Sequence, residues 1–355
     1  MKEDHYNVIG VMSGTSLDGV DLAHIKFKVN QKKWEFEIIE SETISYNSAW
    51  ISTLKAAVDF SETALEDLNQ EYTKLLAKII SDFIQRNKIE NMDAVCSHGH
   101  TILHQPQNGF TLQIGNLPKL ASLIQQTVVC DFRVQDVQMG GQGAPLVPIG
   151  DKILFAEYDY CMNLGGFSNV SFEQNKKRIA FDISPVNTVL NFYANLLGLD
   201  YDDKGKISKT GKTNIALLNT LNSLDFYKKI PPKSLGFEFV KETVLPLIEN
   251  FNIPIEDKLH TFTEHVAMQI ALALPNKKGS LLITGGGAYN SFLLERIQFY
   301  LPEIKIIIPT NKILEFKEAL IFALLGVLKL RGEINTLSSV TGAKSDHSSG
   351  YIYTP

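Results

Sequence analysis

One short stretch near the amino terminus constrains the fold of this chain most. Residues 7–12 form an apolar run, residues 13–19 are mostly small or polar, and residues 20–27 resume a β-rich run. This order predicts a β-hairpin. The turn also has the composition of a phosphate-binding loop, because glycines let backbone N–H groups approach an anion and hydroxyl groups add donors. An ordinary hairpin with a polar turn is the alternative interpretation of this stretch alone.

The same arrangement occurs again in the second half of the chain. An apolar run at 160–164, a glycine-rich turn at 165–169 and a strand at 170–172 follow one another as in the first hairpin. The glycine-rich segment 140–145 precedes this repeat and is typical of a crossing between domains. A weak internal repeat in a chain of 355 residues predicts two α/β domains.

Hydrophobic periodicity predicts the other elements. The expected strands are 34–44, 94–96, 127–130, 280–284 and 304–308, and the expected helices are 61–86, 117–125, 185–197, 264–274, 290–300 and 315–330. Thr63 and Glu66 fit a capping box at the start of the first of these helices. The second expected strand would end at Cys96 and place His98 and His100 in a loop.

Composition excludes several classes of protein. A hydrophobic content of 44% and a charged content of 21% are typical of a globular chain, and a net charge of -5 argues against nucleic acid and an anionic membrane surface as partners. The apolar run 320–328 is too short to span a bilayer, and the charged amino terminus does not resemble a signal peptide. Cys96, Cys130 and Cys161 lack CxxC spacing, which predicts buried free thiols in a reducing, cytoplasmic location.

Three local patterns imitate functional motifs. Residues 205–213 differ from a P-loop by one extra residue between the glycines, so we expect a lysine-rich surface loop. Residues 285–287 are not a dinucleotide fingerprint, because an asparagine stands at the last glycine position, but they indicate a closely approached backbone. His98, His100 and His104 would form a metal site only with other ligands, so hydrogen bonding to a substrate is the preferred interpretation.

Taken together, these stretches resemble the anhydro-N-acetylmuramic acid kinase family of the actin, hexokinase and heat-shock-protein ATPase superfamily. The similar stretches are 10–21, 97–101, 113–115, 131–133, 140–148, 163–166, 181–182, 231–234, 284–288, 317–319 and 340–343. The chain departs from the family pattern at three places. His100 stands where Gln is usual, residues 184–187 where Gly-Pro-Gly-Asn is usual, and Phe237 where Arg is common.

The resemblance implies an α/β fold of two ribonuclease-H-like lobes, as in actin-like ATPases, around a nucleotide and sugar cleft. The first lobe would comprise residues 1–145 and 312–355, and the second residues 146–311. The two glycine-rich turns would grip the phosphates of ATP from both sides. The resemblance also allows a homodimer.

The implied reaction is that of a phosphotransferase with an alcohol group as acceptor, acting in cell-wall sugar recycling. Water opens the 1,6-anhydro bond of anhydro-N-acetylmuramic acid while ATP phosphorylates the freed oxygen. Asp182 would be the general base, and a helix N-cap is its alternative role. Another sugar kinase of the superfamily, without ring opening, and a nucleotide-dependent sensor or filament-forming protein are the other functions to consider.

The remaining implied site residues fall into two sets. Residues expected to bind ATP are Gly14, Thr15, Ser16, Leu17, Asp18, Gly19, Val20, Asp21, Gly165, Gly166, Gly285, Gly286 and Gly287, and Asp18 and Asp21 would hold Mg²⁺. Residues expected to bind the amino sugar are His98, His100, Asp131, Arg133 and Glu318. Arg133 would bind the lactyl carboxylate through its forked guanidinium, and an ion pair with Asp131 is the alternative.

Overall fold

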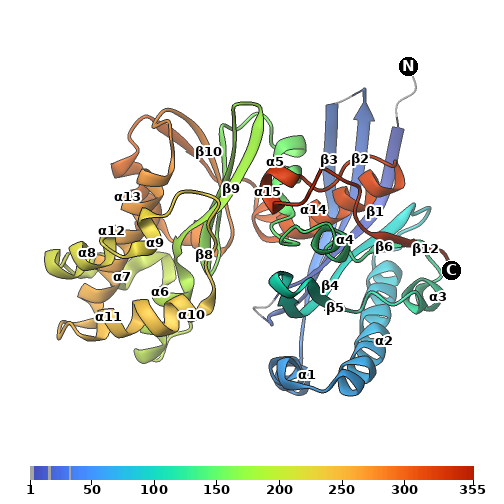
Figure 1. The fold of residues 1–355 in the computed structure, drawn as a ribbon, viewed down its shortest axis with the longest axis horizontal. Helices are drawn as coiled ribbons and strands as arrows, with labels where there is room; N and C mark the ends of the chain where they lie inside the picture. The colour runs from blue at the N-terminus through green and yellow to red at the C-terminus, as the bar shows by residue number, and fades with distance from the viewer. Residues whose placement is uncertain (1–3, 15–16, 32) are drawn as a thin grey trace. The chain divides into compact units, whose positions relative to one another are not determined.

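The computed structural model describes residues 4–14, 17–31 and 33–355 and divides the chain into two compact units (Figure 1). Unit 1 comprises Met1–Leu154 and Phe316–Pro355, and unit 2 comprises Phe155–Glu315. The lobe boundaries that the family resemblance implies, after residues 145 and 311, lie nine and four residues before these limits. No helix of the described residues is long and apolar enough to cross a membrane.

Unit 1 is built on a seven-stranded mixed sheet. Its strands are β1 (Asp4–Ser13), β2 (Gly19–Asn30), β3 (Lys33–Ser45), β4 (Ala94–Gln105), β5 (Phe110–Ile114), β6 (Val128–Cys130) and β12 (Tyr351–Tyr353). They follow the order β12-β6-β4-β1-β2-β3, with β5 paired to β4. The strands β1, β2 and β3 form an antiparallel meander, whereas β4 is parallel to both β1 and β6.

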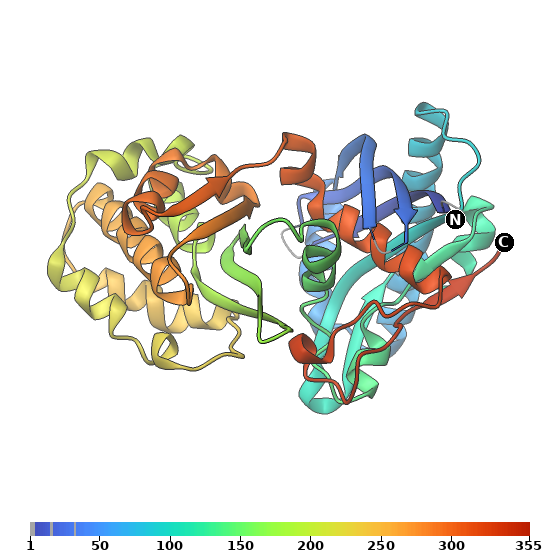
Figure 2. The same ribbon diagram turned by 90° about the horizontal axis from the view of Figure 1, so that it is seen from above.

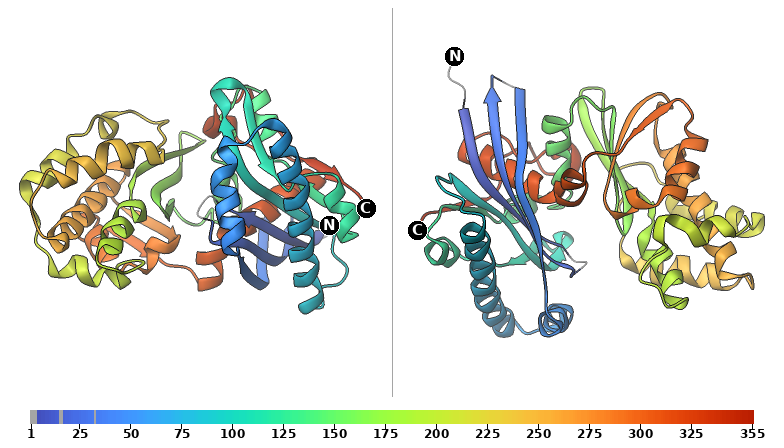
Figure 3. Two further views of the ribbon diagram at one scale, coloured as in Figure 1. Left: turned by 90° about the horizontal axis from the view of Figure 1, so that it is seen from below. Right: turned by 180° about the vertical axis from the view of Figure 1, so that it is seen from behind.

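Helices cover both faces of this sheet. They are α1 (Ser48–Ala56), α2 (Glu62–Arg86), α3 (Lys119–Ile124), α4 (Val134–Gln138), α5 (Val147–Leu154), α14 (Asn311–Leu330) and α15 (Ser338–Thr341). The buried stripe of α2, including Tyr72 and Leu76, packs against Ile9 and Val11 of β1. The helix α14 lies on the opposite face (Figures 2 and 3).

Close backbone packing explains how α14 fits against the sheet. A Cβ atom on Gly10 of β1 would overlap the carbonyl oxygen of Ala319, and one on Gly326 of α14 would overlap the Cys96 sulfur in β4. The Ile321 side chain of α14 occupies the space beside Gly150 of α5, and residues 147–154 belong to unit 1. Gly10, which faces the backbone of α14, is therefore a packing requirement of the fold.

Unit 2 repeats the topology with a five-stranded sheet. Its strands are β7 (Tyr160–Leu164), β8 (Phe167–Gln174), β9 (Lys177–Pro185), β10 (Gly279–Thr284) and β11 (Ile304–Ile307). Its helices are α6 (Asn187–Leu196), α7 (Lys206–Thr210), α8 (Ile215–Asn222), α9 (Asp225–Lys228), α10 (Phe237–Phe239), α11 (Leu245–Glu249), α12 (Ile255–Ala273) and α13 (Ser291–Tyr300). The order β11-β10-β7-β8-β9 matches β6-β4-β1-β2-β3 of unit 1 strand for strand. The predicted repeat and the α/β fold of two ribonuclease-H-like lobes are confirmed.

Several local predictions need correction. The helix α2 is capped by Ser61, whose side chain accepts the N–H of Ala64, so Thr63 is not the cap. The P-loop-like segment is no open loop, because α7 forms within it and the Asp202 carboxylate accepts both the Ser208 N–H and hydroxyl groups. The carboxyl-terminal tail, for which the sequence makes no clear prediction, supplies β12 at the sheet edge. The three cysteines are buried free thiols, as predicted.

Candidate active site

The first predicted phosphate loop closes the β1–β2 hairpin. Ser13 is the last residue of β1 and pairs with Val20 across the turn. Leu17 adopts a left-handed conformation, with φ of 62°, and its N–H donates to the carbonyl oxygen of Gly14 at 3.3 Å. A Cβ atom on Gly19 would overlap the backbone of Ile44 in β3. The hairpin is thus confirmed, and Gly19 is required by the close approach of β3.

Two acidic residues lie in or next to this turn. Asp18 is exposed within it. Asp21 is partly buried in β2, where its Oδ1 accepts the hydroxyl of Thr43 at 2.6 Å. Thr15 and Ser16, the predicted hydroxyl donors, lie outside the described residues.

The strand β4 contains a bulge at the position where the sequence predicts a loop. Gly99 is left-handed, with φ of 73°, and the register with β1 shifts by one residue there. The His98 ring therefore packs against Phe322 of α14, with centroids 4.6 Å apart, whereas the His100 ring packs near Tyr72 of α2 at 5.9 Å. Since α2 and α14 cover opposite faces, the His98 and His100 side chains lie on opposite faces of the sheet. In the described ranges no group of three His, Cys, Asp or Glu side chains is arranged to hold a metal ion.

Arg133 is held by hydrogen bonds next to this strand. Its Nε donates to His98 Nε2 at 2.8 Å, and its NH1 donates to the carbonyl oxygen of Gly143 at 2.6 Å. His98 Nδ1 donates to the Gly99 carbonyl oxygen at 2.9 Å, so the imidazole is neutral. Burial, and secondarily the charge of Arg133, holds the pKa of His98 well below its usual value. The alternative ion pair between Arg133 and Asp131 is not formed.

The loop that carries Gly143 depends on a carboxylate that the sequence analysis did not identify. Asp136 is fully buried, and its Oδ2 accepts the Gly143 N–H at 2.7 Å while its Oδ1 accepts the Thr341 hydroxyl at 2.7 Å. Asp136 thereby ties the loop to α15 and fixes the carbonyl group that orients Arg133. Its position three residues after Arg133 is visible in the sequence, but nothing there marks it as buried.

Two further acidic groups lie near Arg133. Asp131 is partly buried and left-handed, with φ of 61°, and burial raises its pKa to about 6. Glu318 lies on α14 with an exposed side chain, yet the surrounding protein still raises its pKa by desolvation. The charge of Asp21 raises the Glu318 pKa further, whereas Arg133 and Lys317 lower it. Glu318 is therefore within electrostatic reach of both Asp21 and Arg133.

In unit 2, the second predicted phosphate turn joins β7 to β8 and is anchored to α6. The Gly166 carbonyl oxygen accepts the Val186 N–H at 2.8 Å and the Thr188 N–H at 3.3 Å. The Gly165 carbonyl oxygen accepts the Asn187 N–H at 3.3 Å. These contacts hold the turn against the first turn of the helix.

The three consecutive glycines after β10 pack against the same turn. A Cβ atom on Gly285 would lie 2.9 Å from the Leu164 carbonyl oxygen, and one on Gly287 would lie 2.7 Å from the Leu164 Cβ. A Cβ atom on Gly286 would meet nothing closer than Asn187 Nδ2 at 3.8 Å. Gly285 and Gly287 are thus needed for packing, and Gly286 is the one of the three whose backbone a ligand can approach.

Asp182 lies within β9 and not at the end of the strand. Its backbone N–H donates to the Lys233 carbonyl oxygen at 3.0 Å, and its Oδ2 accepts the Leu235 N–H at 2.8 Å. Desolvation raises the pKa of the Asp182 carboxyl, and the Leu235 amide lowers it by less. The helix-cap alternative is wrong, because α6 begins at Asn187 and Asp182 caps no helix. The register of β8 and β9 shifts beside Asp182, an irregularity that is common next to active sites.

A family model described as anhydro-N-acetylmuramic acid kinase matches residues 6–355. The chain belongs to the anhydro-N-acetylmuramic acid kinase family. The enzyme of that name from Mannheimia succiniciproducens is 34% identical over 380 residues, covering 99% of this chain and 100% of the relative. The one from Pasteurella multocida is 35% identical over 373 residues, covering 99% of this chain and 98% of the relative. Among solved structures, component A of (R)-2-hydroxyglutaryl-CoA dehydratase from Acidaminococcus fermentans is similar to this chain with a TM-score of 0.47 and 14% identity. The match covers 92% of this chain and 99% of that one.

As a member of the anhydro-N-acetylmuramic acid kinase family, the chain needs a site for the phosphate groups of ATP. The open backbone at Gly286 and the glycine turn at Gly165 fit a nucleotide, because no side chain fills the space beside Gly286. Asp18 and Asp21 fit Mg²⁺, which usually keeps several waters and takes one or two carboxylates together with substrate phosphates.

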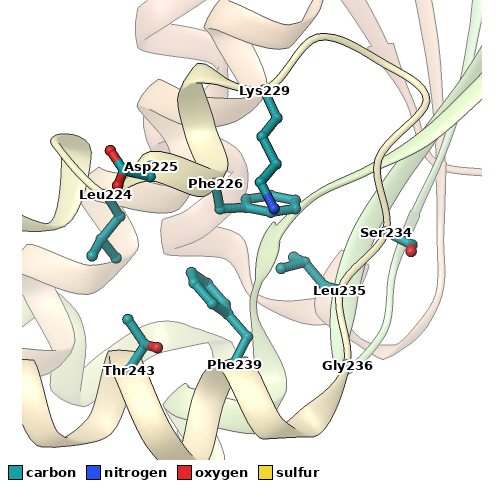
Figure 4. A pocket seen from close by; sticks show the side chains of 9 residues that line it. All are labelled: Leu224, Asp225, Phe226, Lys229, Ser234, Leu235, Gly236, Phe239 and Thr243. Carbon is teal, nitrogen blue, oxygen red and sulfur yellow. The ribbon is translucent and has the colours of Figure 1, made fainter.

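A separate hollow of about 400 Å³ lies in unit 2, between α9, α10 and the loop after Lys233 (Figure 4). It is lined mainly by Leu224, Phe226, Leu235 and Phe239. None of the predicted site residues lines it, and its apolar walls do not suit a phosphate group. Leu235 links it to Asp182, whose carboxylate accepts the Leu235 backbone N–H.

The contrast between Gly286 and Gly287 gives a test of nucleotide binding. Gly286→Ala is expected to leave the melting temperature unchanged and to weaken binding of a non-hydrolysable ATP analogue, because the methyl group enters open space. Gly287→Ala is the matched control and should lower the melting temperature, because its methyl group would press on Leu164. Unchanged nucleotide affinity in Gly286→Ala, measured by calorimetry, would remove this backbone from the site.

Proposed function

We propose that this chain is an ATP-dependent kinase that converts anhydro-N-acetylmuramic acid into N-acetylmuramic acid 6-phosphate and ADP, in cytoplasmic recycling of cell-wall sugars. Family membership over nearly the whole chain supports this activity. The observation in the molecule that supports it best is Asp182, a partly buried carboxylate with a raised pKa and a single backbone N–H partner.

In this proposal Asp182 accepts a proton from water. The water oxygen forms a bond to carbon 1 of the sugar, the bond from carbon 1 to the bridging oxygen breaks, and that oxygen takes the γ-phosphoryl group from ATP. Only one carboxylate is needed, because phosphorus captures the departing oxygen in place of a proton. The raised pKa suits a base, since proton affinity increases with pKa.

Phosphoryl transfer needs positioning and neutralisation of charge more than it needs reactive side chains. The turn from Gly14 to Gly19 and the backbone at Gly286 would provide N–H groups to phosphate oxygens. Asp18 and Asp21 would hold Mg²⁺, which neutralises phosphate charge when bound.

Arg133 would bind the lactyl carboxylate of the sugar. A guanidinium group carries five N–H hydrogens, and His98 and Gly143 use two of them. The remaining hydrogens lie on both terminal nitrogens, which allows an end-on fork to a carboxylate. His98 and Gly143 would therefore orient Arg133 without blocking it.

The decisive experiment is mass spectrometry of the product formed in isotopically heavy water. We expect ATP to be consumed only when the anhydro-sugar is present, and one solvent oxygen to appear at carbon 1 of the 6-phosphate. A phosphorylated product without solvent oxygen would indicate a sugar kinase that does not open the ring. The absence of any product would indicate a nucleotide-dependent sensor.

Asp18→Asn tests the proposed cation site. Because Asp18 is exposed, its replacement should leave the melting temperature unchanged while raising the Mg²⁺ concentration needed for half-maximal turnover. Asp59→Asn in the connection after α1 is a control with the same charge change. A magnesium titration that is identical in wild type and Asp18→Asn would remove Asp18 from the site.

Arg133→Lys tests recognition of the carboxylate. Lysine keeps the charge and loses the fork, so KM for the anhydro-sugar should rise roughly 10- to 100-fold, as expected for loss of a charge-assisted hydrogen bond. The KM for ATP should change little. Anhydro-N-acetylglucosamine, which has no lactyl group, is the comparison: an equal loss with that sugar would make Arg133 a structural residue.

A further inference from the structure

A buried relay of hydrogen bonds ends at His100. It links Tyr72 of α2, Tyr46 just after β3, Ser13 at the end of β1 and His100 in β4. The Tyr72 and Tyr46 hydroxyls are 2.6 Å apart, Tyr46 and Ser13 are 2.6 Å apart, and Ser13 Oγ lies 2.8 Å from His100 Nδ1. All four residues are at least nine-tenths buried, with exposed fractions between 0% and 8%.

Counting hydrogens favours one direction for the relay. Three hydrogen bonds join the four groups, and the three hydroxyls bring three hydrogens. A neutral imidazole brings a fourth hydrogen. If that hydrogen were on Nδ1, one hydrogen would be left over inside the buried relay, which proteins strongly avoid; on Nε2 it lies outside the relay, where a bound ligand can accept it. Ser13 therefore donates to His100 Nδ1.

The tautomer of His100 follows from this direction. With Nδ1 as the acceptor, a neutral imidazole carries its proton on Nε2. Burial lowers the pKa of His100 to about 4, so the ring is neutral at physiological pH. The part of the chain that the structure describes provides no acceptor for the Nε2 hydrogen, although the residue is only 2% exposed. His100 thus presents one oriented donor from a buried position next to the β1–β2 turn.

We propose that Tyr72, Tyr46 and Ser13 are positioning residues that lock His100 as an Nε2–H donor to an oxygen atom of a bound substrate. This proposal rests on the proposed function, because the acceptor belongs either to an ATP phosphate or to the amino sugar. Both sources present the same chemistry, a hydrogen-bond acceptor oxygen. The relay does not support a role for His100 as a nucleophile, as an acid that gives up its proton or as a metal ligand.

The first test observes the tautomer directly. Long-range ¹⁵N–¹H correlation spectra of ¹⁵N-histidine-labelled, deuterated protein should show His100 with an unprotonated Nδ1 and a protonated Nε2 between pH 6 and 8, and His100→Gln assigns its signals. Tyr72→Phe should preserve this pattern, since two hydroxyl hydrogens still fill two bonds. Ser13→Ala should replace it with a mixture of tautomers. A protonated Nδ1 in the wild type would overturn the proposal.

The second test asks which ligand accepts the hydrogen bond. His100→Leu should weaken binding of one ligand, the ATP analogue or the anhydro-sugar, roughly tenfold in calorimetry, as expected for one lost hydrogen bond, and spare the other. His100→Gln should restore the affinity, because an amide group also has one end that accepts and one that donates. Thermal melts of each variant separate this effect from unfolding. Equal affinities of wild type and His100→Leu for both ligands would refute the proposal.

The two proposals fail in different ways. If wild-type protein binds both ligands and makes no 6-phosphate, the proposed reaction is wrong, while the tautomer and the loss of affinity in His100→Leu still support the donor role. If the 6-phosphate forms at the wild-type rate in His100→Leu with unchanged KM values, the donor role is wrong and the proposed reaction stands.

Discussion

Replacing Asp182 with asparagine is expected to reduce turnover by roughly 10²- to 10⁴-fold, the usual contribution of a positioned general base. Asparagine keeps the size of the side chain, and its amide oxygen can still accept the Leu235 N–H. It cannot take a proton from water. The fold and both binding sites should therefore persist while the chemical step is lost.

Single-turnover kinetics together with calorimetric binding of both ligands would check this result. Asp225→Asn is a control with the same charge change in the same unit, since Asp225 has a 92% exposed side chain. In the wild type the activity should fall as the pH drops through the Asp182 pKa. Because desolvation raises that pKa, the fall should occur at a higher pH than for an ordinary aspartate. Near-normal turnover by Asp182→Asn would rule out the role as base.

Gly10→Val is expected to destabilise unit 1 by about 3 kcal/mol or more, at the upper end of overpacking effects. A side chain at this position would overlap the Ala319 carbonyl oxygen. That oxygen belongs to the backbone of α14 and cannot rotate away as a side-chain atom would. The strand and the helix would have to separate, and both carry residues of the proposed site.

Thermal unfolding followed by circular dichroism would measure this effect as a lowered melting temperature. Gly109→Ala is the control, because a Cβ atom there meets nothing within 4 Å and its only cost is the left-handed backbone, about 1–2 kcal/mol. Equal melting temperatures for Gly10→Val and the wild type would show that the contact between β1 and α14 yields easily.

Patterns along the chain were sufficient to predict the secondary structure around both glycine-rich turns and the repeat of the fold. Alternation of apolar residues, small residues in turns and helical periodicity depend on neighbours in sequence, so they are visible without tertiary contacts. The bounds of β4 could not be predicted in this way. Its continuation past Cys96 depends on pairing with β1 and β5, which are distant in sequence.

The features of the candidate site also fall into two groups, those that the sequence predicts and those that depend on tertiary contacts. The sequence by itself was enough to predict the two glycine-rich turns and the free thiols. Its motifs were also enough to predict the family. Only the tertiary structure decided that the Gly99 bulge sends His98 and His100 to opposite faces, that Asp136 ties Gly143 to α15, and that Asp182 accepts the Leu235 N–H. Each of these depends on a hydrogen bond or packing contact between distant segments, and a local pattern of residues carries no information about which distant partner will be present.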